Sequence, residues 1–245
     1  MISAFRTALA LVFTILATIL GALVAFPWTW ISGSADVLYA IAMSIARTGL
    51  RIAGVRIQIE GMERINPSET YIFMCNHVSN LDPPILIPAL SRRTSVLVKK
   101  ELFQVPILGR AMRMGDLVAV DRRNREAAVN SMRAAEAVMS RGLNMTVFPE
   151  GTRSRDGRLL PFKKGPFYLA MDSGIPVVAV TILGSESLMP KGSSLIHPGT
   201  VRLVFHAQIS PKQFTDNDDL ISAVRSEIAS ALPPSLREPN LNSAS

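Results

Sequence analysis

The sequence predicts an α/β fold with a mixed, mostly parallel sheet flanked by helices, joined to an N-terminal hydrophobic two-helix membrane anchor. Short β-rich runs alternate with helical patterns after Gly54, which is typical of a sheet covered by helices. No charged residue occurs between Thr7 and Ala35. The single cysteine, Cys75, excludes a disulfide framework. We therefore divide the 245 residues into a membrane-associated helical hairpin at 1–53, an α/β domain at 54–232 and a polar tail at 233–245.

The first segment, 7–26, is apolar apart from threonines and Gly21. About twenty helical residues at about 1.5 Å each reach about 30 Å, the thickness of a bilayer's hydrocarbon core. A cleaved signal peptide is the alternative, but its apolar stretch is usually only about 7–15 residues. Pro27 then predicts the end of the helix, and Trp28 and Trp30 follow it where a bilayer interface would lie.

A second helix is predicted over 36–52, with apolar residues on one face and arginines on another, a pattern that favours an interfacial helix. Arg6 precedes the pair, and Arg47, Arg51 and Arg56 follow the first span. This charge distribution fits a re-entrant hairpin with both ends cytoplasmic, or one span with the body inside. Both alternatives place the body on the cytoplasmic face.

The body contains seven candidate strands and two long candidate helices. The strands are expected at 55–60, 71–75, 95–98, 117–120, 144–148, 177–182 and 201–208. The helices are expected at 124–141, where Gly142 follows the last turn, and at 216–232. The tail is expected to fray.

The chain has a formal net charge of +7, and its basic residues are concentrated in two windows, 90–125 and 148–165. A basic surface indicates an anionic partner. These windows fit a solvated rim that holds the domain against anionic lipid, a phosphate pocket, or both. Aromatic side chains are scarce in the first window and no nucleotide-binding glycine motif occurs, so we expect no nucleic acid partner.

The first candidate loop, 76–84, follows an apolar strand and contains His77 and Asp82. An imidazole, with an unperturbed pKa near 6.5, is suited to take a hydroxyl proton at neutral pH. Asp82 can fold back and accept a hydrogen bond from the other ring nitrogen. The sequence Asp-Pro-Pro equally predicts that Asp82 caps a helix. The spacing leaves both roles open.

The second candidate loop, 148–154, reads FPEGTRS and also ends a strand. Gly151 lets the backbone approach a ligand, and Arg153 can clamp a phosphate. Glu150 can position that arginine or a substrate hydroxyl, although a turn with an exposed Glu–Arg pair is the commoner outcome. Gly165 then begins a helix whose N-terminus favours an anion.

These loops belong to a series of four blocks. The blocks are NH-x4-D at 76–82, KKEL to GDLVAVDR at 99–122, FPEGTRS at 148–154 and GIPVVAV at 174–180. In this order and spacing they resemble the glycerolipid acyltransferase family, most closely the bacterial 1-acyl-sn-glycerol-3-phosphate (lysophosphatidate) acyltransferases. The resemblance covers roughly 57–209 and implies a glycerol-3-phosphate acyltransferase-like fold. One departure is the strand 118–120, where many members carry a bulkier aromatic segment, which bears on acyl-chain selectivity.

The resemblance also implies the roles of individual residues. His77 would be the general base on the glycerol 2-hydroxyl, and Asp82 would orient it. The glycerol phosphate would be held by residues of the second and third blocks: Lys100, Arg122, Glu150, Gly151, Thr152 and Arg153. The activated hydroxyl would attack an acyl thioester directly, giving phosphatidic acid and free thiol, without a metal or organic cofactor.

The implied partners are lysophosphatidic acid, an acyl-CoA or acyl-ACP donor, and the lipid bilayer, with acyl carrier protein as a further candidate. The implied location is the bacterial inner (cytoplasmic) membrane, with the catalytic domain on the cytoplasmic face. Another lysolipid, such as a lyso-ornithine lipid, is an alternative acceptor.

Two rival interpretations come from the residues. Cys75 could be a nucleophile with His77 as its base, because residues i and i+2 of a strand share a face; a cysteine that ends an apolar strand is more often inert core. In a different class, the chain could be a non-enzymatic peripheral protein that binds anionic lipid through its basic windows.

Overall fold

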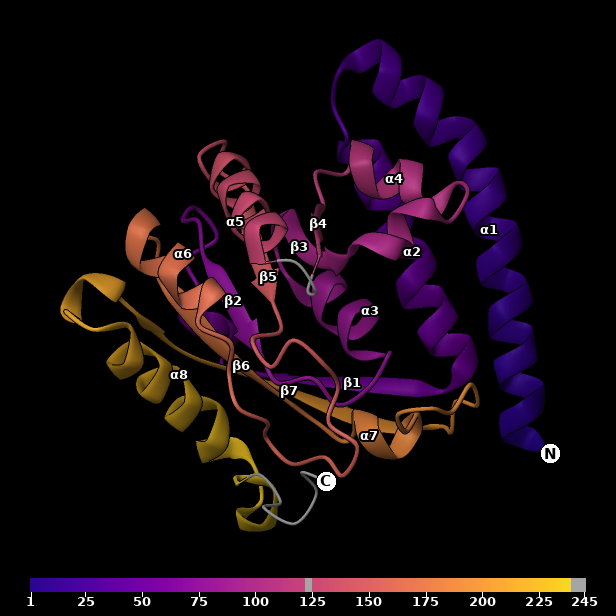
Figure 1. The fold of residues 1–245 in the computed structure, drawn as a ribbon. Coiled ribbons are helices and arrows are strands. Elements are labelled where there is room, and N and C mark those ends of the chain that lie inside the picture. Colours follow the sequence, from indigo (N-terminus) through magenta and orange to yellow (C-terminus); the bar gives the residue numbers. More distant parts are fainter. Residues whose placement is uncertain (122–124, 239–245) are drawn as a thin grey trace.

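A seven-stranded sheet is the middle layer of the computed structural model, which describes residues 1–121 and 125–238 (Figure 1). The strands are β1 (Val55–Glu60), β2 (Ile72–Cys75), β3 (Thr94–Lys99), β4 (Val118–Val120), β5 (Asn144–Val147), β6 (Val177–Leu183) and β7 (Gly199–Ile209). Their order is β1-β7-β6-β2-β5-β3-β4. Only the β6–β7 pair is antiparallel among these described strands. The predicted mixed, mostly parallel sheet is therefore confirmed.

Helices cover both faces of the sheet (Figure 1). One face is covered by α5 (Arg125–Met139), α6 (Gly165–Ser173) and α8 (Asn217–Ala231). The other is covered by α2 (Asp36–Ala53) and α3 (Asp82–Leu86). The long helices of the body follow the prediction, and Asp216 caps α8 by accepting the Asp218 N–H at 3.0 Å. The short helices α4 (Leu108–Met114) and α7 (Ser185–Leu188) were not predicted.

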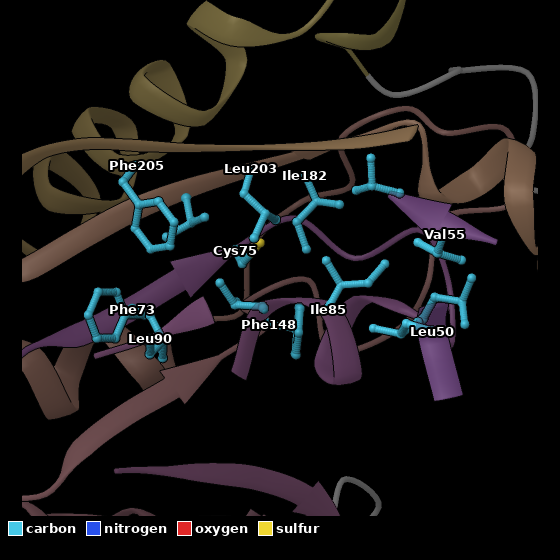
Figure 2. Packing of buried hydrophobic residues seen from close by; sticks show 14 of the residues in the cluster. Leu50, Val55, Phe73, Cys75, Ile85, Leu90, Phe148, Ile182, Leu203 and Phe205 are labelled. Carbon is cyan, nitrogen blue, oxygen red and sulfur yellow. The ribbon is translucent and has the colours of Figure 1, made fainter. Parts of the chain in front are cut away.

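The core forms as two apolar layers, one on each side of the sheet. Successive side chains of β2 point to opposite faces, so Phe73 and Cys75 join one cluster while Ile72 and Met74 join the other. All four are buried, as expected for a central strand with helices on both sides. Figure 2 shows the first cluster, where Phe73 lies edge-on to Phe205 of β7 with ring centroids 6.2 Å apart.

The N-terminal helix α1 (Ile2–Ser32) packs along α2 at the edge of the molecule (Figure 1). Among the described helices, α1 alone is long and apolar enough to cross a membrane, by length and composition. The predicted end at Pro27 is wrong, because α1 continues to Ser32. An interior proline removes one N–H bond and crowds the preceding turn, yet α1 continues through Pro27 and ends at Gly33, whose φ of 67° supplies the left-handed cap. The two tryptophans therefore lie on the last helical turns.

Polar contacts join this helical pair to the body. Arg93, just before β3, contacts Asp36 of α2 at 3.0 Å and Asp116 at 3.0 Å. The Thr7 hydroxyl of α1 contacts the backbone N–H of Ile196 at 2.9 Å. Arg93 thus ties α2 to the body, and Thr7 ties α1 to the loop between β6 and β7.

Candidate active site

Three loops leave the sheet at the carboxyl ends of β6, β2 and β5. They leave on the same side because these three strands are adjacent and parallel. They are the NH-x4-D loop after β2, the FPEGTRS loop after β5 and the segment between β6 and β7, hereafter the 184–198 loop. The carboxyl ends of parallel strands are where α/β proteins place their sites. Sheet order therefore gathers segments that are distant in the sequence.

His77 and Asp82 meet in the first loop. The Nδ1 atom of His77 is 2.7 Å from Oδ2 of Asp82. The Asp82 side chain is fully buried, whereas that of His77 retains 14% exposure. A carboxylate at Nδ1 accepts the proton on that nitrogen, which leaves Nε2 as the basic atom. The structure brings the two predicted residues together, with Asp82 placed to orient the imidazole; the role of His77 as a general base stays a prediction.

The Asp82 carboxylate is held by three donors besides His77. Its Oδ2 accepts the backbone N–H groups of Val78 at 2.7 Å and Ser79 at 2.8 Å, and its Oδ1 accepts the Ser185 hydroxyl at 2.6 Å. Ser185 is fully buried and begins α7 in the 184–198 loop. No local pattern in the sequence indicated Ser185, because its partner lies 103 positions away.

The alternative interpretation, in which Asp82 caps α3, is wrong. Asp82 is the first residue of α3, and its carboxylate turns back toward the loop. The two residues after it are prolines, which have no N–H to offer. The N–H of Ile85 bonds to the Leu81 carbonyl instead.

Glu150 joins the first two loops from below the surface. It is only 2% exposed. Its Oε1 accepts the backbone N–H of His77 at 2.7 Å, and its Oε2 accepts that of Leu160 at 3.1 Å. Burial raises the pKa of Glu150 to about 8, although the two backbone hydrogen bonds favour the carboxylate. The prediction that Glu150 forms an exposed pair with Arg153 is wrong, because Glu150 is buried and its two oxygens accept backbone N–H groups. Contact of Glu150 with a phosphate stays a prediction.

Two more contacts fix His77 against the FPEGTRS loop. The Phe148 ring stacks on the imidazole with centroids 4.3 Å apart and planes at 29°. The backbone N–H of Ser154 donates to the His77 carbonyl at 2.8 Å. His77 is therefore held at one face of its ring, at its backbone carbonyl and at Nδ1.

Asn76, the first residue of the NH-x4-D block, has a structural role that the sequence analysis did not assign. Its side chain donates to the Ile182 carbonyl at 2.9 Å and accepts the Ile182 N–H at 2.8 Å. These two bonds extend the β2–β6 pairing beyond Cys75. They set the direction in which the chain leaves β2 and enters the His77 loop.

The other predicted substrate residues lie in two places. In the FPEGTRS loop, Gly151 has φ +69°, Thr152 is exposed and Arg153 is half-buried. Lys100 lies after β3, and its ammonium is 2.5 Å from the Asp121 carboxylate. Arg122 lies outside the described residues. Contact of these residues with a phosphate stays a prediction.

An apolar groove of about 570 Å³ runs between α1 and α2 toward this site. Leu81 and Pro84, which flank Asp82, form part of its wall, and Ile107 and Leu108 line another part. Ile107 has φ 61°, an uncommon conformation for a β-branched residue. The groove therefore brings an apolar channel to the His77 loop.

Cys75 is fully buried in the cluster of Figure 2, beside Phe148 and Ile85. Burial raises the pKa of its thiol well above the usual value, and the carboxylates of Asp82 and Glu150 raise it further. A thiolate is the reactive form of cysteine, so these surroundings disfavour the rival interpretation of Cys75 as a nucleophile.

Comparisons with known proteins agree with this geometry. The family model described as Acyltransferase matches residues 56–183. A chloroplastic 1-acyl-sn-glycerol-3-phosphate acyltransferase of Arabidopsis thaliana is 35% identical over 179 residues, which are 72% of this chain and 49% of the relative. The alpha enzyme of that name from Mus musculus is 27% identical over 67% of this chain and 59% of its own.

A solved structure is also similar. The crystal structure of the 1-acyl-sn-glycerophosphate acyltransferase from Thermotoga maritima superposes with a TM-score of 0.73 and 28% identity, covering 91% of this chain and 94% of the other. By contrast, the chain spans about half the length of the first curated relatives it matches.

Proposed function

Since this chain belongs to the acyltransferase family, we propose that it transfers an acyl group from an acyl thioester to the 2-hydroxyl of 1-acyl-sn-glycerol-3-phosphate. The observation that carries the proposal is the 2.7 Å contact between His77 Nδ1 and the buried Asp82 carboxylate. The relatives named for this reaction in plants and mammals support the choice of acceptor. The donor is acyl-CoA or acyl-ACP.

In the proposed step, Nε2 of His77 removes the proton of the acceptor hydroxyl as its oxygen attacks the thioester carbonyl carbon. The C–S bond breaks, and the imidazolium returns the proton to the departing sulfur. Asp82 stabilises the imidazolium while the charge is present. General-base catalysis accounts for about 10²–10⁴ of the rate, and positioning supplies much of the remainder. The step needs no metal or organic cofactor, because the thioester carries its own leaving group.

The acceptor has a phosphate and an acyl chain, and the site offers a partner for each. Arg153 lies in the loop that contacts His77, and a guanidinium binds phosphate oxygens in pairs. We assign Lys100, Arg122, Gly151 and Thr152 to the same headgroup region. The apolar groove between α1 and α2 supports the placement of an acyl chain next to Leu81.

Membrane association is part of the proposal. α1 exposes large apolar side chains along most of its length, which supports insertion into lipid. Positive residues that flank the helical pair support a body on the cytoplasmic face of a bacterial inner membrane. A lipid acceptor would then reach the groove from the bilayer.

The test uses detergent-purified protein with palmitoyl-CoA or a palmitoyl-ACP donor and 1-acyl-sn-glycerol-3-phosphate, following thiol release and phosphatidic acid together. We expect release that requires the acceptor, is lost in His77→Ala, and persists in His197→Ala, since His197 is exposed in the 184–198 loop. Cys75→Ala should retain activity.

Other outcomes would contradict the proposal in separate ways. Thiol release without acceptor would indicate a thioesterase. Transfer only to a different lysolipid, such as a lyso-ornithine lipid, would overturn the choice of acceptor. Binding to anionic vesicles without turnover by folded protein would favour the non-enzymatic class.

A further inference from the structure

Lys191, which none of the four sequence blocks contains, reaches from the 184–198 loop into the FPEGTRS loop. Its ammonium donates to the backbone carbonyl of Arg153 at 2.6 Å. Arg153 and Arg155 flank Ser154, whose N–H holds the His77 carbonyl at 2.8 Å. One lysine and two arginines from two separate segments therefore meet around Ser154, the residue that bonds to the His77 backbone.

Lys191 lies close enough to Arg153 and Arg155 for their charges to act on its ammonium. Burial lowers the pKa of Lys191, and the charges of Arg155 and Arg153 lower it further. Within the described part of the chain, none of the three forms an ion pair. The nearest carboxylate along the chain, Asp156, accepts from the Ser154 hydroxyl at 3.0 Å and faces Arg158 at 3.5 Å. Gathering like charges costs free energy that a bound anion offsets.

The position of Lys191 is fixed relative to the catalytic pair. In the same loop, Ser185 donates to Asp82 at 2.6 Å, and the Met189 carbonyl accepts the Ser79 hydroxyl at 2.8 Å. Both contacts lie within six residues of Lys191. An ammonium has three donors, of which the Arg153 carbonyl takes one. Two N–H bonds of Lys191 have no acceptor among the residues that the structure describes, and they can donate to oxygens of an anion.

We propose that Lys191 is a binding residue for the phosphomonoester of the acceptor, which the 184–198 loop and the FPEGTRS loop hold together. This assignment rests on the proposed function. The acceptor phosphate is favoured over a donor phosphate because Lys191 bonds to the residue next to Ser154, and the Ser154 N–H bonds to the His77 carbonyl. The short glycerol backbone of the acceptor must bring its hydroxyl to the same His77.

The experiment measures kcat and KM for Lys191→Ala and Lys191→Gln with palmitoyl-CoA and two acceptors, 1-acyl-sn-glycerol-3-phosphate and the phosphate-free 1-acylglycerol. Glutamine keeps a donor for the Arg153 carbonyl but removes the charge. We expect both variants to raise KM for the phosphorylated acceptor about ten- to a hundredfold, the range for a hydrogen bond to a charged group. The KM for palmitoyl-CoA and any turnover of 1-acylglycerol should remain as in the wild type. Lys212→Ala is the matched control, since Lys212 is exposed in the turn after β7 at the opposite edge of the sheet.

Three results would overturn the assignment. A raised KM for palmitoyl-CoA with an unchanged acceptor KM would place Lys191 on the donor phosphates. Wild-type kinetics in Lys191→Gln, with a defect in Lys191→Ala, would show that Lys191 only supports the loop. An equal fall in kcat with both acceptors would also indicate a purely structural role. A wild-type enzyme that does not use the phosphorylated acceptor at all would instead refute the proposed function.

Discussion

The Asp82 carboxylate accepts four hydrogen bonds, from His77, Val78, Ser79 and Ser185. Three of these donors come from the loop that carries His77, so the loop closes on its own carboxylate. The fourth donor, Ser185, comes from α7 and holds the other carboxylate oxygen, Oδ1. A carboxylate held in this way cannot rotate away from Nδ1 without leaving several buried donors unpaired, which costs about 1–3 kcal/mol for each group. The orientation of the imidazole is thus determined by the whole loop.

Replacing Ser185 by alanine should weaken this support without removing either catalytic group. We expect Ser185→Ala to lower kcat about five- to thirtyfold, corresponding to about 1–2 kcal/mol for the lost hydrogen bond, with little change in either KM. The measurement is steady-state kinetics across pH, because a less restrained imidazole should also shift the pH profile of kcat. Ser187→Ala is the control, since Ser187 is exposed on the same short helix. Equal kinetics for the two variants would contradict a positioning role for Ser185.

Glu150 predicts a pH dependence of stability. Its pKa is about 8 in the folded protein, against an ordinary value of 4.5. The folded state therefore binds this proton more tightly than the unfolded state, so the contribution of Glu150 is fully present below about pH 4.5 and is lost as the pH rises through about 8.

Thermal unfolding of the wild type and Glu150→Gln, measured in detergent from pH 5 to pH 8.5, tests this. Glutamine cannot ionise, so we expect the wild-type melting temperature to fall relative to the variant as the pH increases. A difference in melting temperature that is independent of pH, or one that grows in favour of the wild type, would contradict the prediction.

At the scale of elements, α1 and α2 are shaped to leave a groove rather than to close against each other. α1 presents small residues to this side, among them Ala10, Thr14, Gly21 and Ala22. A Cβ atom at Gly21 would lie 2.7 Å from Cγ2 of Ile41, so the helices are close at that level. Between the close contacts the groove remains open toward Leu81.

Filling this groove should change which acyl chains the protein accepts. We expect Ala22→Phe to reduce turnover of substrates with long acyl chains about tenfold or more while retaining short ones, because the added ring occupies groove volume. The measurement is activity with a series of 1-acyl-sn-glycerol-3-phosphates and of acyl-CoA donors of different length. Leu20→Phe is the matched control, because Leu20 lies two positions before Ala22 on α1, does not line the groove and is 64% exposed. An unchanged chain-length profile in Ala22→Phe would show that the groove does not bind the acyl chain.

For the whole molecule, the exposed apolar surface of α1 and the catalytic edge of the sheet are joined through the 184–198 loop. Ile196 of this loop bonds to Thr7 of α1, and Ser185 of the same loop bonds to Asp82. Arg93 adds a second connection between α2 and the body. These contacts place the groove, the exposed apolar helix α1 and the His77–Asp82 pair in one assembly.

This arrangement predicts that apolar α1 residues hold the protein in the membrane. Replacing Leu16 and Leu20, which are 56% and 64% exposed, by lysine should shift the protein from the membrane fraction to the soluble fraction, because a lysine at the bilayer centre costs about 2.5–3.5 kcal/mol. Sedimentation after alkaline carbonate washing gives the readout. Lysines at Asp219 and Ser226, which are exposed on α8, provide a control of equal number. Unchanged sedimentation of the α1 variant would contradict insertion of this face.

Local sequence patterns were sufficient for most strands, for the long helices of the body and for the pairing of His77 with Asp82, because each depends on residues within a few positions or on apolar periodicity. They failed at Pro27, where the cap at Gly33 outweighs one missing hydrogen bond. The partners of Glu150, Asn76 and Asp82 lay beyond local patterns, since His77 and Glu150 are 73 positions apart, Asn76 and Ile182 are 106 apart, and Asp82 and Ser185 are 103 apart.

Only the order of the sheet brings those residues together. With β6, β2 and β5 side by side and parallel, three distant loops meet at one edge. There Glu150 accepts the backbone N–H of His77, and Lys191 donates to the carbonyl of Arg153. The side-chain types of the candidate reacting groups, His77 and Asp82, could therefore be predicted from a short motif, because they lie close together in the sequence. Their orientation and the grouping of the cations depended on tertiary packing, because hydrogen bonds and charge interactions act through space and not along the chain.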